Sequence, residues 1–133
     1  MSTSNTFSDE IFDIVTQTKA YVPDANIGIH CHNDIGLAVA NTLAAIKAGA
    51  RQVQGTINGL GERCGNADLI TLIPTLMLKL GFTTSIPKEK LSKLVSLSRM
   101  VDDRLNLVPD SHAPYVGSAA FAHKGGLHAS AAQ

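Results

Sequence analysis

Two histidines separated by one residue, His30 and His32, are the side chains in this sequence best suited to hold a metal ion. They end the segment NIGIHCH, whose residue types predict a strand over residues 26–32. Side chains alternate along a strand, so both imidazoles are expected on one face, with Ile29 and Cys31 on the other. Imidazoles at this spacing can chelate a divalent ion. The spacing alone also allows two ordinary histidines on an ordinary strand.

The loop NGLGERCGN over residues 58–66 is the second group of interest. Glu62 and Arg63 place opposite charges side by side, and Asn66 lies where its amide could either cap the next helix or bind a metal. Such a loop before a helix either makes a tight turn or cradles a phosphate, and the tight turn is favoured. Close backbone approach and positive φ are permitted by three glycines, Gly59, Gly61 and Gly65.

Two nearby residues have several possible roles. Asp34 could bind a metal, orient an imidazole or cap a helix, and capping is favoured. Cys64 has no adjacent base in the sequence, so it is interpreted as a small packing residue rather than a nucleophile. With only two cysteines and no CxxC, both thiols are expected to be reduced.

The C-terminal segment carries a third group. His123 and His128 flank Lys124 in the stretch AHKGGLH, and Tyr115 precedes them. The segment has few large apolar residues. The spacing alone slightly favours a solvated turn over a site.

The elements that must position these residues alternate. Helices are predicted over residues 9–20, 37–48 and 69–80, with strands over 26–32 and 51–57. Ser8, and either Asn33 or Asp34, are candidate caps for the first two helices, and Gly49 and Gly81 are expected to end the second and third. Pro74 predicts a kink or break in the third. This order favours an α/β fold with parallel strands, but two strands do not close a sheet.

The character of the chain changes after Gly81. A helix is predicted from about Pro87 through Leu105, with its apolar residues on one face, followed by a loop over 106–114. A domain boundary is therefore expected near residues 82–86.

Bulk properties exclude some classes of function. Lys and Arg total 11, as do Asp and Glu, so no basic excess favours nucleic acid. No apolar run is long enough to span a bilayer. The N-terminal decapeptide MSTSNTFSDE resembles neither a signal nor a transit peptide, and a cytoplasmic protein is expected.

The segments GIHCHNDIGLAVANTLAAIKAGARQVQGTINGLGERCGNADL and PYVGSAAFAHKGGLHASA resemble the acetyl-CoA-dependent 2-oxoacid synthases. That family includes isopropylmalate, homocitrate and citramalate synthases, and the second segment is most similar to the long-form citramalate branch. The resemblance covers about residues 8–133 and implies the C-terminal part of a TIM (β/α)₈ barrel followed by a helical linker. The implied domains are 1–82, a partial pyruvate carboxyltransferase-like barrel, and 83–133, a partial linker.

The resemblance also implies roles for residues. His30, His32 and Asn66 would bind a divalent metal (Zn, Mn or Mg), and Glu62 and His128 would be catalytic, with His128 serving the site of a neighbouring subunit. The implied reaction condenses acetyl-CoA, the co-substrate, with pyruvate or a related 2-oxoacid in isoleucine or branched-chain amino-acid biosynthesis. A homodimer is implied, with neither nucleic acid nor membrane as partner.

The sequence departs from the family pattern at its N-terminus. The family's first strand, with an Asp ligand and an oxoacid-binding Arg, has no counterpart here, and MSTSNTFS matches the end of the sixth strand poorly. About a quarter of a barrel is therefore expected, inactive by itself and either marginally stable or oligomeric because its strand edges are open. An activity on a longer 2-oxoacid, or a catalytically inactive fragment, are the alternatives.

Overall fold

The computed structural model describes residues 6–122 and divides them into two compact units, one ending at Ser85 and the other beginning at Ile86. The first unit contains α1 (Ser8–Tyr21), β1 (Gly28–His30), α2 (Ala38–Ala48), β2 (Gln52–Gln54), η1 (Ile57–Gly59), α3 (Leu69–Pro74) and η2 (Thr75–Lys79). The second contains η3 (Lys88–Lys93), α4 (Leu94–Arg104) and η4 (Ser118–Phe121).

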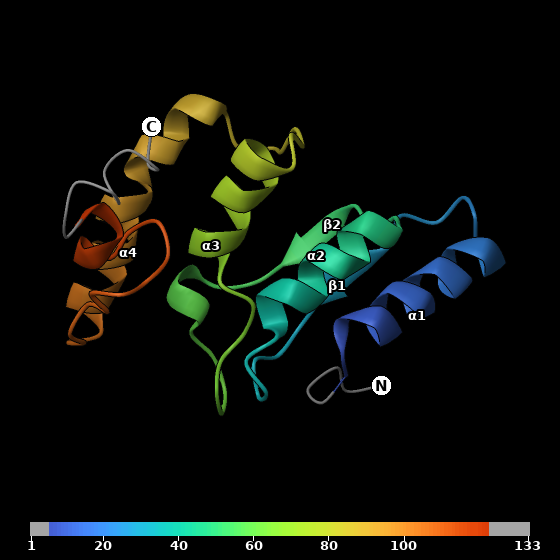
Figure 1. Cartoon of the computed structure of the whole chain (residues 1–133), viewed down its shortest axis with the longest axis horizontal. Helices are drawn as coiled ribbons and strands as arrows, with labels where there is room; N and C mark the ends of the chain where they lie inside the picture. The colour runs from blue at the N-terminus through green and yellow to red at the C-terminus, as the bar shows by residue number, and fades with distance from the viewer. Residues whose placement is uncertain (1–5, 123–133) are drawn as a thin grey trace. The chain divides into compact units, whose positions relative to one another are not determined.

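The two strands form a parallel sheet, as the alternation of elements predicts. Gly28 pairs with Gln52 and His30 with Gln54, and in Figure 1 the two strands lie side by side with α2 beside them. Each strand is shorter than predicted, because the sheet has only two strands and pairing beyond them is reduced to isolated bridges. One such bridge joins His32 to Asn66 and brings the end of the glycine-rich loop to the end of β1.

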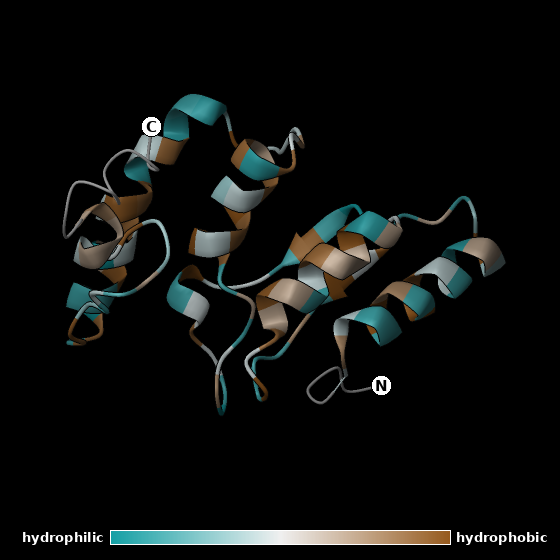
Figure 2. Cartoon of the chain, in the orientation of Figure 1, coloured by the Kyte–Doolittle hydropathy of each residue, from teal (hydrophilic) through white to brown (hydrophobic). Residues whose placement is uncertain are grey.

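Two groups of buried residues hold this unit together. One joins α1 to α2 through Ile11, Val15 and Ala45. The other lies at the strand ends, where four fully buried residues meet: Cys31, Ala38, Ala67 and Leu72. In Figure 2, α1 alternates hydrophilic and hydrophobic residues, as expected for a helix with one face covered. The second group is mostly small residues, so the loop after β2 can approach the strand end closely.

The two predicted helix C-termini are confirmed, whereas the predicted N-terminal caps differ. Gly49 has a φ of 121° and ends α2, and Gly81 has a φ of 69° just after η2. The N-cap position of α2 is Leu37, but the side chain of Asn33, rather than that of Asp34, accepts a hydrogen bond from the backbone amide of Ala38 at 3.1 Å. Ser8 is the first residue of α1 rather than its cap. Its hydroxyl instead donates to the buried side chain of Asn41 at 2.8 Å.

The third predicted helix changes form at Pro74. α3 ends there and continues as the π-helical turn η2, because proline has no amide hydrogen to give the preceding turn. The helix predicted from Pro87 likewise starts as the 3₁₀ turn η3 before becoming α4. The kink or break predicted at Pro74 is therefore confirmed, whereas the 3₁₀ start of the second helix differs from the continuous helix that the sequence predicts.

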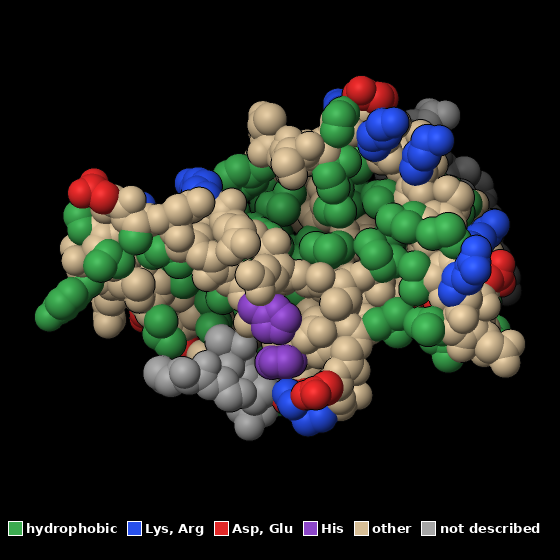
Figure 3. Space-filling view, turned by 180° about the vertical axis from the view of Figure 1, so that it is seen from behind, with side chains coloured by type: hydrophobic (Ala, Val, Ile, Leu, Met, Phe, Trp, Pro, Cys, Tyr) green, Lys and Arg blue, Asp and Glu red, His purple; other side chains and the backbone are tan. Residues whose placement is uncertain are grey.

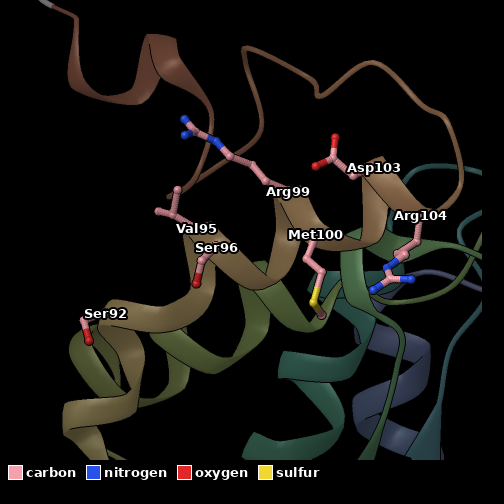
Figure 4. A pocket seen from close by; sticks show the side chains of 7 residues that line it. All are labelled: Ser92, Val95, Ser96, Arg99, Met100, Asp103 and Arg104. Atoms are coloured by element: carbon pink, nitrogen blue, oxygen red, sulfur yellow. The ribbon is translucent and has the colours of Figure 1, made fainter.

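In its described part, the second unit consists of η3, α4, a loop and the short turn η4. Ser98 and Asp102 are buried on one side of α4, together with Val116 from the following segment. α4 also contributes to a groove at which Arg99 and Asp103 project about one turn apart (Figure 4). The groove is lined by Ser92, Val95, Ser96, Arg99, Met100, Asp103 and Arg104.

Candidate metal centre

The two histidines at the end of β1 face the same way. Their ring centroids are 5.1 Å apart and the rings meet edge to face at 81°. Cys31, between them, is fully buried in the strand-end core. The alternation predicted from the sequence is therefore confirmed. The space-filling view shows two histidine side chains next to each other at the surface, beside acidic and basic side chains (Figure 3).

The glycine-rich loop is a tight turn, as favoured from the sequence. The backbone N–H of Asn66 donates to the Gly59 carbonyl at 2.9 Å, and this hydrogen bond closes the turn. Gly65, with a φ of 90°, lies so close that a Cβ there would collide with the Gly59 carbonyl oxygen. Gly61 is required for a different reason, because a Cβ there would collide with the side-chain amide of Asn66. The loop thus closes around Asn66.

Asn66 is held with its carboxamide in one orientation. The Nδ2 group donates to the Leu60 carbonyl at 3.1 Å, which turns Oδ1 the other way. Asp68 caps α3 by accepting from the Ile70 amide at 3.0 Å, so the capping role considered for Asn66 is wrong. Asn66 is therefore left with an oxygen acceptor that the helix does not use.

Two buried polar atoms at this place have no hydrogen-bond partner: Nδ1 of His32 and Oδ1 of Asn66. Leaving a buried polar atom unpaired is costly, and these two atoms belong to residues joined by one backbone bridge, so they are available to a shared partner. An imidazole nitrogen and an amide oxygen suit a divalent cation. With His30 beside them, these residues fit part of a metal site. The described residues contain no group of three His, Cys, Asp or Glu side chains able to hold a metal.

The two charged residues of the loop, Glu62 and Arg63, differ in their contacts and exposure. Arg63 reaches back to the loop after β1 and binds Asp34, with Nε 3.1 and 3.0 Å from the two carboxylate oxygens and an Nη–Oδ2 distance of 2.9 Å. Glu62, a predicted catalytic residue, is 87% exposed, and its carboxylate lies 3.9 Å from the Arg63 guanidinium. Within the described residues, Glu62 is thus at the edge of the site.

The Asp34–Arg63 pair shifts the pKa of each side chain in the direction that favours its charged form. Chiefly through its hydrogen bond, and also through its charge, Arg63 holds the pKa of the Asp34 carboxyl below its usual value, although partial desolvation opposes this. Asp34 in turn raises the pKa of Arg63. The pair was not foreseen, because the two residues are 29 positions apart and no local pattern joins them.

Two further expectations have different outcomes. Cys64 is exposed, so its interpretation as a packing residue is wrong, and it and Cys31 are free thiols. His128, together with His123 and Lys124, lies outside the described residues. Tyr115 lies within them, at a positive φ of 65°.

Comparison with known proteins places these features in a family. The profile described as HMGL-like matches residues 3–101. The chain belongs to the HMGL-like family. It is 56% identical over 126 residues to the (R)-citramalate synthase of Aquifex aeolicus, covering 95% of this chain and 24% of that protein. The Synechocystis enzyme of the same name is 63% identical over 107 residues, covering 80% and 19%. This family member thus spans about a quarter or less of these curated relatives.

Solved structures agree on the fold of this HMGL-like chain. An HMG-CoA lyase from A. baumannii, solved in complex with coenzyme A and 3-methylmalate, superimposes with a TM-score of 0.71 at 25% identity, covering 93% of this chain and 42% of the lyase. An HMG-CoA lyase from Brucella melitensis gives 0.64 at 21% identity, covering 78% and 38%. The chain is part of a TIM barrel, as predicted. None of the helices in the described part has the length and apolar character of a membrane span.

Proposed function

We propose that this chain supplies the metal-binding strand end and adjoining loop of an enzyme that condenses acetyl-CoA with pyruvate to give (R)-citramalate and CoA. The observation that carries the proposal is the pair of unpartnered buried atoms, His32 Nδ1 and Asn66 Oδ1, beside the ring of His30. The likeness to (R)-citramalate synthases at 50–63% identity supports this reaction over others in the family. The chain covers only part of such an enzyme, so the activity belongs to the whole protein.

His30, His32 and Asn66 would hold the metal, which is Zn, Mn or Mg. A divalent ion bound there would polarise the ketone of the oxoacid as a Lewis acid. Asn66 presents its oxygen because the Leu60 carbonyl fixes the orientation of its amide. The strand holds the two imidazoles on one face, so little ordering remains to be done on binding.

Glu62 and His128 are the proposed acid–base residues. Removing a proton from the acetyl methyl group of acetyl-CoA requires a base, and hydrolysis of the thioester product requires proton transfer again. Glu62 lies four residues before Asn66, on the solvent side of the same turn, where a bound substrate would meet it. His128 is assigned by family resemblance and would act in a partner subunit of a homodimer. We place the protein in the cytoplasm, in isoleucine biosynthesis.

An activity on a longer 2-oxoacid is the second candidate. A 2-isopropylmalate synthase of Campylobacter fetus is 44% identical over 126 residues, covering 90% of this chain and 24% of that protein. That identity is lower than for the citramalate synthases, which favours pyruvate.

A chimera tests the proposal. Residues 8–133 replace the matching segment of the Aquifex aeolicus enzyme, and CoA release from acetyl-CoA is followed with pyruvate and with a branched 2-oxoacid. We expect turnover with pyruvate that His32→Ala abolishes, and little with the branched acid. The control variant Arg99→Asn, on the exposed side of α4, should keep full activity. A folded chimera without activity on pyruvate would contradict the proposal, and preference for the branched acid would support the second candidate.

A further inference from the structure

Arg63 has a backbone conformation that its residue type does not favour. Its φ is 57°, in the left-handed region, where a Cβ is crowded by the backbone. The same loop uses glycine for this purpose at Gly59, with φ 67°, and at Gly65, with φ 90°. Asn58, with φ 59°, is the fourth such position in the loop, but asparagine tolerates this region. At Arg63 the residue type makes the conformation costly, and a side-chain interaction must offset that cost.

The side chain of Arg63 makes such an interaction. Its guanidinium meets the Asp34 carboxylate through three contacts of 2.9 to 3.1 Å, a forked geometry that suits arginine and that lysine cannot reproduce. The neighbouring approach of Arg63 to Glu62, at 3.9 Å to an almost fully exposed carboxylate, lacks this geometry and contributes little. Arg63 is thus directed to Asp34.

This pair joins the two loops that carry the candidate ligands. Asp34 lies two residues after His32, and Arg63 lies three before Asn66. On the buried side, the same loops are joined by main-chain hydrogen bonds from Asn33 to Gly65 and from Ala67 to Cys31, at 2.9 and 3.0 Å. On the outer side, the ion pair joins the same loops, and the Asp34 carboxylate also accepts a hydrogen bond from the backbone of Cys64.

We propose that the Asp34–Arg63 pair is a clasp that positions Asn66 against His30 and His32. The inference rests on the function proposed above and adds positioning residues to that site. Two hydrogen bonds on the inner side leave the loop free to hinge about them. A forked contact on the outer side removes that freedom and fixes the distance between the Asn66 amide and the imidazoles.

The test separates the effect of losing the guanidinium from the effect of changing the backbone conformation at residue 63. Arg63→Asn removes the fork but keeps a residue that tolerates positive φ, and Arg63→Lys keeps the charge without the fork. Arg99→Asn on α4 is the matched control. The first readout is amide hydrogen exchange of Asn33, Asn66 and Ala67 in the metal-free chain. We expect exchange about five- to tenfold faster in Arg63→Asn, an intermediate effect in Arg63→Lys and no effect in the control.

The second readout is Mn²⁺ affinity, measured by titration of the free-ion paramagnetic resonance signal. We expect Arg63→Asn to bind Mn²⁺ about five- to tenfold more weakly than the parent chain, and His32→Ala to lose binding. Unchanged exchange in Arg63→Asn overturns the clasp, and so does faster exchange with unchanged Mn²⁺ affinity. If Arg63→Asn exchanges faster but the parent chain binds no Mn²⁺, the clasp is supported and the proposed function is contradicted.

Discussion

The two compact units differ in how completely their apolar side chains are covered. The first buries a closed group of residues at the strand ends, including Cys31 and Leu72 at 0% exposure. The second buries Val116 as its one large apolar side chain among the described residues, while Leu107 is 46% and Val108 92% exposed. Every candidate ligand within the described residues lies on the first unit. The side chains suited to chemistry therefore lie on the first unit, which is better packed, and neighbours on the same unit fix their geometry.

The largest effect that tests this comparison is a pair of leucine truncations. Leu72→Ala leaves a cavity in the strand-end core and should cost about 2–5 kcal/mol of unfolding free energy. Leu107→Ala removes the same atoms from a half-exposed position in the second unit and should cost less than about 1 kcal/mol. Urea unfolding followed by circular dichroism measures both. Equal losses would show that the two units are packed alike.

A pair of glycine substitutions asks whether the packing extends into the loop that carries Asn66. Both Gly65 and Gly81 have positive φ, so alanine strains each backbone by about 1 kcal/mol. At Gly65 the new Cβ would also collide with the Gly59 carbonyl oxygen, whereas nothing lies near it at Gly81. We expect Gly65→Ala to cost about 1–3 kcal/mol more than Gly81→Ala. Urea unfolding measures both variants. Equal losses of unfolding free energy would mean that the loop around Gly65 is loosely packed.

The smallest effect is a shift in one titration. Since the Arg63 hydrogen bond lowers the pKa of Asp34 below its ordinary 3.8, the ion pair is complete above that pH and is lost only as the pH falls through the lowered value. The carboxyl carbon shift of Asp34 in nuclear magnetic resonance should therefore have its midpoint below 3.8. In Arg63→Asn the midpoint should move upward. If the titration midpoint of Asp34 is the same in Arg63→Asn as in the parent chain, the ion pair does not persist in solution.

Local sequence patterns predicted the strand alternation and the helix C-termini of the first unit. The alternation of NIGIHCH placed both imidazoles on one face, and Gly49 and Gly81 marked helix ends, because these features depend on neighbours within a few residues. Caps were less certain, since Ser8 and Asp34 could each bond to the adjacent helix and instead bond to residues far along the chain.

The sequence could not supply the contacts that define the site. The Leu60 carbonyl that orients Asn66, and the fork between Arg63 and Asp34, depend on the path of the loop in three dimensions. The unpartnered nitrogen of His32 likewise appears only when every neighbouring donor and acceptor has been placed. Residue types suggest a metal, and these unpartnered atoms support the position proposed for it.

We propose that His30, His32 and Asn66 form the metal-binding edge of this chain. The most direct test is the urea midpoint of the chain with and without Mn²⁺, compared with that of His30→Ala/His32→Ala. A ligand that binds only the folded state stabilises it, by about 2.7 kcal/mol at 100 times its dissociation constant. We expect Mn²⁺ to raise the midpoint of the parent chain and leave that of the double variant unchanged. An equal rise in both, or none in either, would contradict the account.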